Sequence, residues 1–214
     1  DDGMLTIIDL SDQQYLNIIA SLNLKASSWI KSLKLSADEK TLFVTTTMCL
    51  EIINVTNPRS PTLISKIIDP LLDQNEPLVG DKKKLFIPKM ALSRDEKMLY
   101  VAGEGLQILN VTNLSRPRIL FSKRSNFLQD DDNKYRITSL ALLPDGKTLI
   151  YGNKTLDFYD VSSSNPIEPK LINSYPAQVT ITSVYLSKDA KTIYAAGWGI
   201  NQQLMLEKIN ISDP

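Results

Sequence analysis

The chain has 214 residues with 24 basic and 24 acidic side chains, so its formal net charge is zero, and it contains no histidine and one cysteine. Because its charge is balanced, the chain has no net electrostatic attraction to nucleic acid or to an anionic membrane, and neither is expected as the main partner. The missing histidine removes the commonest general base and metal ligand, and a single cysteine cannot form an internal disulfide.

Short strands without intervening helices are predicted along the whole chain. The first is a strand at 4–10, and the first complete set begins with alternating apolar residues at 33–35. A turn at 36–40 follows, then strands at 42–44 and 50–55, a proline-rich turn at 57–61 and a fourth strand at 62–67. The last predicted strand covers 204–211. Four short strands in each period favour antiparallel sheets arranged as propeller blades.

Two motifs recur with a period of about 50 residues. An apolar residue stands four positions before an Asn or Asp at Leu5, Leu50, Leu106, Leu156 and Leu206. The second motif recurs as LKLSADEKTLFV, MALSRDEKMLYV, LALLPDGKTLIY and VYLSKDAKTIYA. The predicted fold is an all-β propeller of four-stranded antiparallel blades, with about four blades present. We expect these blades at 3–24 (a remnant), 30–67, 86–124, 136–174 and 180–213 (a partial blade).

The segments LEIINVTNPRSPTLIS (50–65) and LQILNVTNLSRPRILF (106–121) resemble the LVIVD repeat of β-propeller proteins, many of which are secreted or anchored at the cell surface. The likeness continues through four periods in phase. Asn54, Asn110 and Asn210 replace the Asp of the family pattern, and Ser65 or Asn173 stands where a Gly is expected. The resemblance implies the fold and leaves the function open.

The phase of the repeat predicts a segment of a larger propeller. The chain starts in a third strand, which we interpret as a cut end, and it stops after another third strand. If the four blades closed into a ring, one extra strand, equivalent to the third strand of a blade, would remain. The two outer blades would present unpaired edges, which proteins normally close or cover.

Irregular connections concentrate at one end of the predicted blades. The segments 67–84, 125–135 and 197–203 exceed the minimum loop length, and such loops on a rigid scaffold often bind partners. Both tryptophans fall at this end, where they either form an interaction rim or pack between blades and over the core edge. We assign Lys31, Lys89, Thr138 and Thr182 to one repeat position. The candidate interaction rim is Trp29, Lys31, Lys89, Tyr135, Thr138, Thr182 and Trp198.

We predict no catalytic residue, cofactor or metal in this segment. The acidic run at 130–133 lacks the alternating spacing of a calcium loop. The recurrent turn aspartates are expected to cap turns, and the sequence brings no carboxylate pair or phosphate-binding loop together. These turn residues are Asp38, Asp95, Asp145 and Asp189.

Five candidate N-glycosylation sites occur, at Asn54, Asn110, Asn113, Asn153 and Asn210. Three of them share one repeat position, where an Asn side chain would also cap the following turn. Glycosylated sites would place the protein outside the cell or on its surface, and the alternative is a cytoplasmic protein.

The leading hypothesis is a non-catalytic propeller scaffold for protein–protein interaction or structural assembly within a larger surface or secreted protein. Its partner would be another protein or further blades of the same chain. One alternative is a propeller-type hydrolase or lactonase whose catalytic residues lie mainly outside this segment, and another is a structural spacer. We expect no direct membrane insertion, because no apolar run approaches the roughly 20 residues that span a bilayer.

Overall fold

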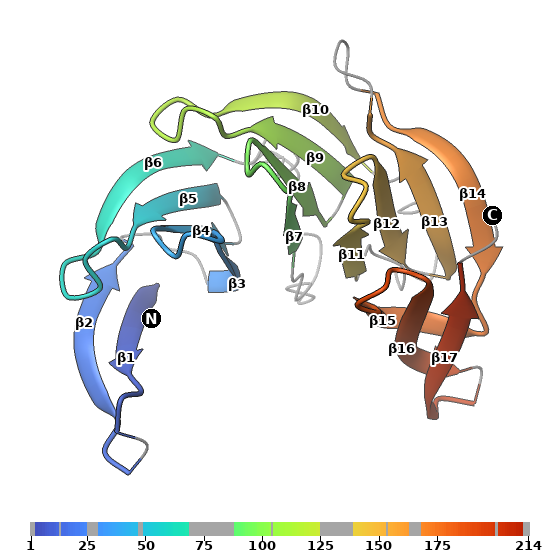
Figure 1. The fold of residues 1–214 in the computed structure, drawn as a ribbon, viewed down its shortest axis with the longest axis horizontal. Helices are drawn as coiled ribbons and strands as arrows, with labels where there is room; N and C mark the ends of the chain where they lie inside the picture. Colours follow the sequence, from blue (N-terminus) through green and yellow to red (C-terminus); the bar gives the residue numbers. More distant parts are fainter. Residues whose placement is uncertain are drawn as a thin grey trace, which may run out of the picture. The chain divides into compact units, whose positions relative to one another are not determined.

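The computed structural model describes residues 3–12, 14–24, 30–46, 49–68, 88–103, 105–124, 139–152, 154–162, 168–199 and 201–211. Every helix or strand in these residues is a β-strand (Figure 1). The strands form three four-stranded sheets, one three-stranded sheet and one two-stranded sheet. The fold is therefore the predicted all-β propeller with antiparallel blades.

The chain divides into two compact units, residues 1–85 with 112–117 and residues 86–111 with 118–214. In every sheet the strands pair in chain order, so each blade is an antiparallel meander. The sheets of the first unit contain β1 (Met4–Asp9), β2 (Asn17–Asn23), β3 (Ile30–Leu35), β4 (Thr41–Thr46), β5 (Cys49–Asn54) and β6 (Thr62–Ile68). Those of the second unit contain β7 (Lys89–Leu92), β8 (Met98–Ala102), β9 (Gly105–Asn110), β10 (Arg118–Arg124), β11 (Ser139–Leu142), β12 (Thr148–Gly152), β13 (Thr155–Asp160), β14 (Lys170–Pro176), β15 (Val179–Leu186), β16 (Thr192–Gly199) and β17 (Leu204–Asn210).

A Ser-x-Asp turn joins the first two strands of most blades. The Ser36 hydroxyl donates to Asp38 Oδ1 (2.6 Å) and accepts a hydrogen bond from the Thr41 N–H (3.0 Å). The same contacts recur at Ser93 with Asp95 and at Ser187 with Asp189. In the turn without the serine, Asp145 accepts from the N–H groups of Lys147 and Thr148. The four aspartates therefore cap turns, as predicted.

Every described fourth strand carries a β-bulge. In β6, Ser65 pairs with Ile52 and Leu63 with Ile53, so one extra residue lies between them. The registers of β2, β10 and β14 shift in the same place. Ser65, at the expected Gly position, donates its hydroxyl to the Leu114 carbonyl oxygen (2.6 Å). Bulges of this kind increase the local twist of a strand.

Each sheet buries a face against the next sheet in its own unit. In the second unit, Tyr100 packs with Leu149 between β7–β10 and β11–β14, and Leu156 packs with Ile181 between β11–β14 and β15–β17. In the first unit, the cluster of Leu5, Leu24, Val44 and Ile53 lies between β1–β2 and β3–β6. Full burial of one such side chain stabilises the fold by roughly 1.5–3 kcal/mol, so sheet stacking supplies the core.

Candidate functional site

Four residues of the predicted rim lie in described parts of the chain, and Trp29, Tyr135 and Thr138 lie outside them. Lys31 and Thr182 are the extra residues of bulges in the first strands β3 and β15. Their equivalence is confirmed, because each stands five positions before the turn serine. Thr182 is exposed and donates its hydroxyl to the Ala196 carbonyl oxygen (3.2 Å).

The prediction that Lys89 shares the repeat position of Lys31 is wrong. It pairs with Ala102 at the start of β7, as Ser139 pairs with Gly152 at the start of β11. Lys89 is therefore equivalent to Ser139, and Pro88 takes the position that we gave to Lys89. The two positions differ by one residue, because Lys89 stands four positions before the turn residue Ser93, whereas Lys31 stands five positions before Ser36.

Trp198 belongs to a strand and not to the loop in which we placed it. It lies near the end of β16, where it pairs with Thr180 on one side and Leu204 on the other. The chain reverses after Gly199, whose N–H donates to the Gln203 carbonyl oxygen (2.9 Å). The side chain remains partly exposed, so Trp198 faces solvent from a rigid strand.

In β5, β9, β13 and β17 a polar side chain directly follows the leucine of the repeat, which is Leu50, Leu106, Leu156 or Leu206. In β5, β9 and β13 the residue is Glu51, Gln107 and Asp157, and all three are buried. In β17 it is Glu207, which is half-buried. Charged residues are rarely buried without a partner, so the contacts of this position decide what it does.

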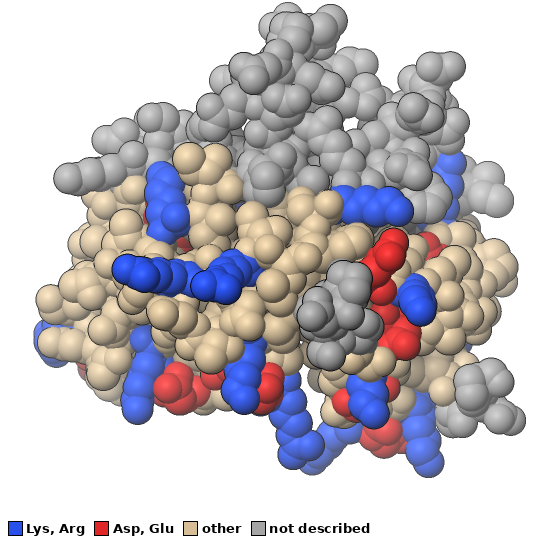
Figure 2. Space-filling view, turned by 90° about the horizontal axis from the view of Figure 1, so that it is seen from above, with Lys and Arg blue, Asp and Glu red and all other residues tan. Residues whose placement is uncertain are grey.

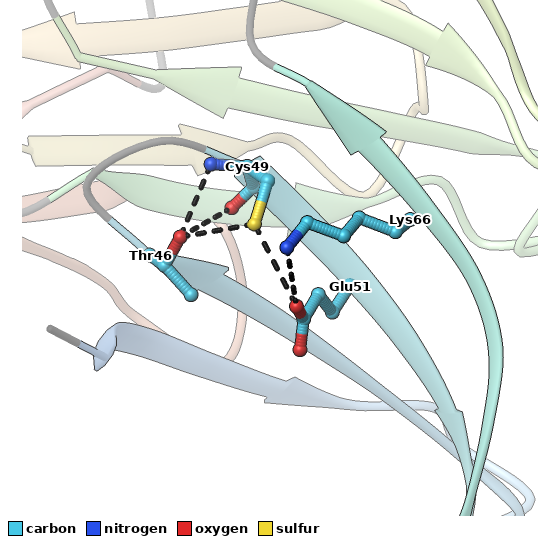
Figure 3. A network of polar contacts seen from close by, with 4 residues as sticks. All are labelled: Thr46, Cys49, Glu51 and Lys66. Atoms are coloured by element: carbon cyan, nitrogen blue, oxygen red, sulfur yellow. Dashed lines mark hydrogen bonds and ion pairs between the residues drawn. The ribbon is translucent and has the colours of Figure 1, made fainter. Parts of the chain in front are cut away.

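Glu51 belongs to a buried polar network with Thr46, Cys49 and Lys66 (Figure 3). The Lys66 ammonium lies 3.3 Å from Glu51 Oε1, and the Cys49 thiol donates to the same oxygen (3.7 Å). The Thr46 hydroxyl accepts from the Cys49 N–H (3.1 Å) and donates to the Cys49 carbonyl oxygen (3.2 Å). Among the described residues, Glu51 Oε2 has no hydrogen-bond partner.

The electrostatics of this network suit an internal brace. Burial raises the pKa of the Cys49 thiol, which keeps it protonated and a weak nucleophile at neutral pH. Partial burial lowers the pKa of Lys66, but the neighbouring Cys49 and Glu51 raise it by more. Lys66 therefore stays charged and neutralises the Glu51 carboxylate. The network therefore holds β4, β5 and β6 together.

In the second unit, Asp157 and Glu207 at this position form hydrogen bonds within and between blades. The Ser174 hydroxyl donates to Asp157 Oδ1 (2.5 Å), which links β14 to β13 within one sheet. Glu207 Oε1 accepts from the hydroxyl of Tyr175 on β14 of the preceding blade (3.0 Å), and Oε2 accepts from the N–H of Gln178, which directly precedes β15 (3.1 Å). Asp157 therefore connects two strands within one blade, and Glu207 connects its blade to the preceding one.

An apolar surface is exposed on one face of the β15–β17 sheet. Cross-strand pairing places Trp198 beside Leu204, Ala196 beside Leu206 and Tyr185 beside Tyr194, all on the face opposite the buried Ile181. Leu204 is 74% exposed and Leu206 is 69% exposed. The equivalents of Leu206 in the two preceding blades, Leu106 and Leu156, are buried beneath the sheet that follows each of them. We call Tyr185, Trp198, Leu204 and Leu206 the β15–β17 surface.

The described residues show no cluster of metal-ligating side chains, and the face seen in Figure 2 mixes charges of both signs. They contain no group of three or more Cys, Asp or Glu side chains that could hold a metal. The acidic run at 130–133 lies outside them. On the face shown in Figure 2, basic and acidic side chains are interspersed and do not form a large patch of one charge sign. No described helix is long and apolar enough to cross a membrane.

Two of the candidate glycosylation sites cap turns through their side-chain oxygens. Asn54 Oδ1 accepts from the Thr56 N–H (2.9 Å), and Asn113 Oδ1 accepts from the Ser115 N–H (3.1 Å). Both residues are exposed, as is Asn210, whereas Asn110 is half-buried and Asn153 lies outside the described residues. Capping uses the amide oxygen, and glycosylation uses the amide nitrogen.

Residues 91–123, which cover β8, β9, the second half of β7 and nearly all of β10, match the LVIVD repeat family. The chain carries an LVIVD repeat. This match confirms the resemblance in the blade where the motif LQILNVTN stands. Comparison with curated protein sequences found no match.

Solved structures support the propeller fold. A Lactobacillus plantarum protein matches with a TM-score of 0.68 at 14% identity, over 97% of this chain and 65% of its own. A Bacteroides uniformis protein, provisionally assigned as a 6-phosphogluconolactonase, matches with a TM-score of 0.67 at 13% identity, over 98% and 66%. The β-propeller domain of Cps50 (Swd1) from Myceliophthora thermophila gives 0.66 at 12% identity, over 97% and 62%. At these identities the likeness shows the fold alone, and the chain spans about two thirds of each structure.

Proposed function

We propose that this chain is a non-catalytic propeller scaffold for protein–protein interaction or structural assembly, within a larger protein that is secreted or held at the cell surface. The observation that supports this function is the β15–β17 surface. Two leucines, a tryptophan and a tyrosine on one sheet face form the kind of apolar surface that marks interaction sites. Tryptophan and tyrosine are also enriched among residues that dominate binding energy.

The repeat indicates how this surface is used. Leu156 packs against the apolar face of β15–β17 that contains Ile181, so one blade serves as the binding surface for the next. Leu206 stands at the same repeat position and is open. The occupant is therefore another apolar β-surface, from a partner protein or from a further blade.

Site-specific photo-crosslinking in the full-length protein tests the proposal. A photoreactive residue at position 206 should form a protein–protein crosslink, because a bound surface covers it. The matched control is position 171 on β14, where Leu171 is 55% exposed but lies on an outer strand. Crosslinking at position 206 no higher than at position 171 would contradict the proposal.

The cellular location is tested at Asn54. Thr56→Ala destroys the glycosylation site and keeps the Asn54 cap, whereas Thr56→Ser keeps both. If the protein passes through a eukaryotic secretory pathway, we expect a glycosidase-sensitive mass that Thr56→Ala removes and Thr56→Ser retains. Identical masses for both variants and the parent would argue against a sugar at this site.

A further inference from the structure

One row of side chains beside the β15–β17 surface differs from the matching row of the two preceding blades. Strand pairing places one residue from each of the first three strands of a blade side by side, on the face opposite the preceding blade. The row is Tyr185–Tyr194–Lys208 in β15–β17, Ala141–Ile150–Phe158 in β11–β14 and Ala91–Tyr100–Ile108 in β7–β10. Its two ends therefore change from alanine and a large apolar residue to tyrosine and lysine.

The two preceding blades show what this row contains when another blade covers it. Ala91 and Ile108 are buried in the cluster that β7–β10 shares with β11–β14. Phe158 packs against the cluster that contains Ile181 of β15. A small residue at one end of the row and an apolar residue at the other therefore accompany the stacking of blade on blade.

Tyr185 and Lys208 do not suit a blade stacked in this way. Tyr185 is 71% exposed, and Lys208 is exposed as well. A blade stacked like the preceding ones would cover an ammonium group where Phe158 stands in its own blade, and a phenol ring where an alanine stands. Lys208 makes no ion pair with a described residue, and covering a charge without a partner is costly.

Lysine at this position is confined to β17. Two positions after the leucine of the repeat, the other third strands have an apolar residue, which is Ile52 in β5, Ile108 in β9 and Phe158 in β13. In β17 the leucine is retained as Leu206, and the next residue on the same face is Lys208. This face therefore combines apolar contact area with one unpaired positive charge, and a complementary occupant has apolar side chains and one negative charge.

We propose that the β15–β17 surface binds a separate protein that places an Asp or Glu side chain against Lys208. This inference rests on the proposed function and specifies the chemistry of the partner. Apolar side chains of the partner cover Trp198, Leu204 and Leu206, and its carboxylate pairs with the Lys208 ammonium. The Tyr185 hydroxyl, at the other end of the row, offers a further hydrogen-bond donor. The charge pair selects the partner and fixes its orientation on the sheet.

Charge variants of the full-length protein in its native cells test the pairing, with a photoreactive residue at position 206 in every variant. Lys208→Glu reverses the charge, and Lys208→Arg retains it. Lys123→Glu is the matched control, because it makes the same change in net charge at an exposed position on β10. We expect Lys208→Glu to reduce the protein–protein crosslink about tenfold or more, and the other two variants to leave it within about twofold of the parent.

Carbodiimide coupling gives a second measurement that needs no substitution at position 206. The reagent joins a lysine amine to a carboxylate in contact with it as an amide, with loss of water, and it does not couple the arginine guanidinium. In the parent protein, mass spectrometry should find Lys208 joined to an Asp or Glu of a different protein. Lys208→Arg should remove this product.

The outcomes separate this inference from the proposed function. A crosslink at position 206 that Lys208→Glu does not weaken would overturn the inference and leave the proposed function standing. An amide from Lys208 to the same polypeptide or to a second copy would also overturn it, because a further blade or a dimer would then cover the surface. Absence of any crosslink at position 206 in the parent would contradict the proposed function itself.

Discussion

Lys66→Met should destabilise the first unit far more than Glu51→Gln, although both substitutions break the same ion pair. The Glu51 side chain is fully buried, whereas 40% of the Lys66 side chain is exposed. Loss of the ammonium leaves a charged carboxylate in the interior, and its Oε2 already lacks a partner among the described residues. Breaking a buried pair in this way costs about 3–5 kcal/mol, and the partial exposure of Lys66 lowers our expectation to about 2–4 kcal/mol.

Glu51→Gln removes the buried charge together with the ion pair. Lys66 keeps its contact with water, and the new amide retains a carbonyl oxygen that can accept from Cys49. Gln107, at the same position of the next blade, is itself buried. The expected loss is about 0–1 kcal/mol, since a neutral hydrogen-bonding group replaces a buried charge of the same shape.

Urea denaturation of both variants in a Trp198→Phe background measures the difference. Trp29 is then the sole tryptophan, so its fluorescence reports on the unit that contains the network. The slope of the transition should be unchanged, which shows that the midpoint shift reflects stability. Equal losses for the two substitutions, or no loss for Lys66→Met, would refute the reasoning.

Three further predictions concern turns and close contacts. Ser36→Ala removes a hydroxyl of a buried side chain that makes two hydrogen bonds, and urea denaturation should show a loss of about 1–2 kcal/mol. Ser60→Ala changes an exposed side chain and should alter stability little. Gly197→Ala should lower the melting temperature more than Gly199→Ala. A Cβ at position 197 overlaps the Thr180 backbone carbonyl, whereas a Cβ at position 199 meets the flexible Met205 side chain. Equal shifts in melting temperature would contradict this prediction. Hydrogen bonds from the hydroxyls of Ser36, Ser93 and Ser187 lower the pKa values of Asp38, Asp95 and Asp189. The three carboxylates therefore stabilise the fold at pH values above their unfolded pKa of about 3.9. This stabilisation is lost as the pH falls through their folded pKa values. Replacing all three by Asn should flatten the fall of the unfolding midpoint in urea below about pH 4, and an unchanged pH profile would count against this assignment.

The sequence predicted the strands and turns well because these depend on local patterns. Ser36 with Asp38 lies between alternating apolar residues, and the structure places both in the expected turn. The third strand is recognisable from the Leu50 to Asn54 spacing. Sheet stacking follows, because a four-stranded blade cannot bury two apolar faces alone.

Other features depend on contacts between distant residues. The bulges at Lys31 and Thr182, which add one residue to the first strands β3 and β15, are among them. The sequence did not predict that Glu51 is buried, since a single carboxylate among apolar residues is usually solvated. A signal was present, because Gln107 and Asp157 repeat a polar residue at the same place. Exposure of Leu206 could be found only by comparing its blade with the blade that buries Leu156.

Hydroxyl-radical footprinting of the full-length protein in its native cells tests the central claim most directly. Leu33, Leu171 and Leu206 are all highly exposed in this chain, but only Leu33 and Leu206 lie on faces that equivalent blades bury. We predict strong oxidation at Leu171 and weak oxidation at Leu33 and Leu206. Oxidation of all three in proportion to their exposure in this chain would contradict the account.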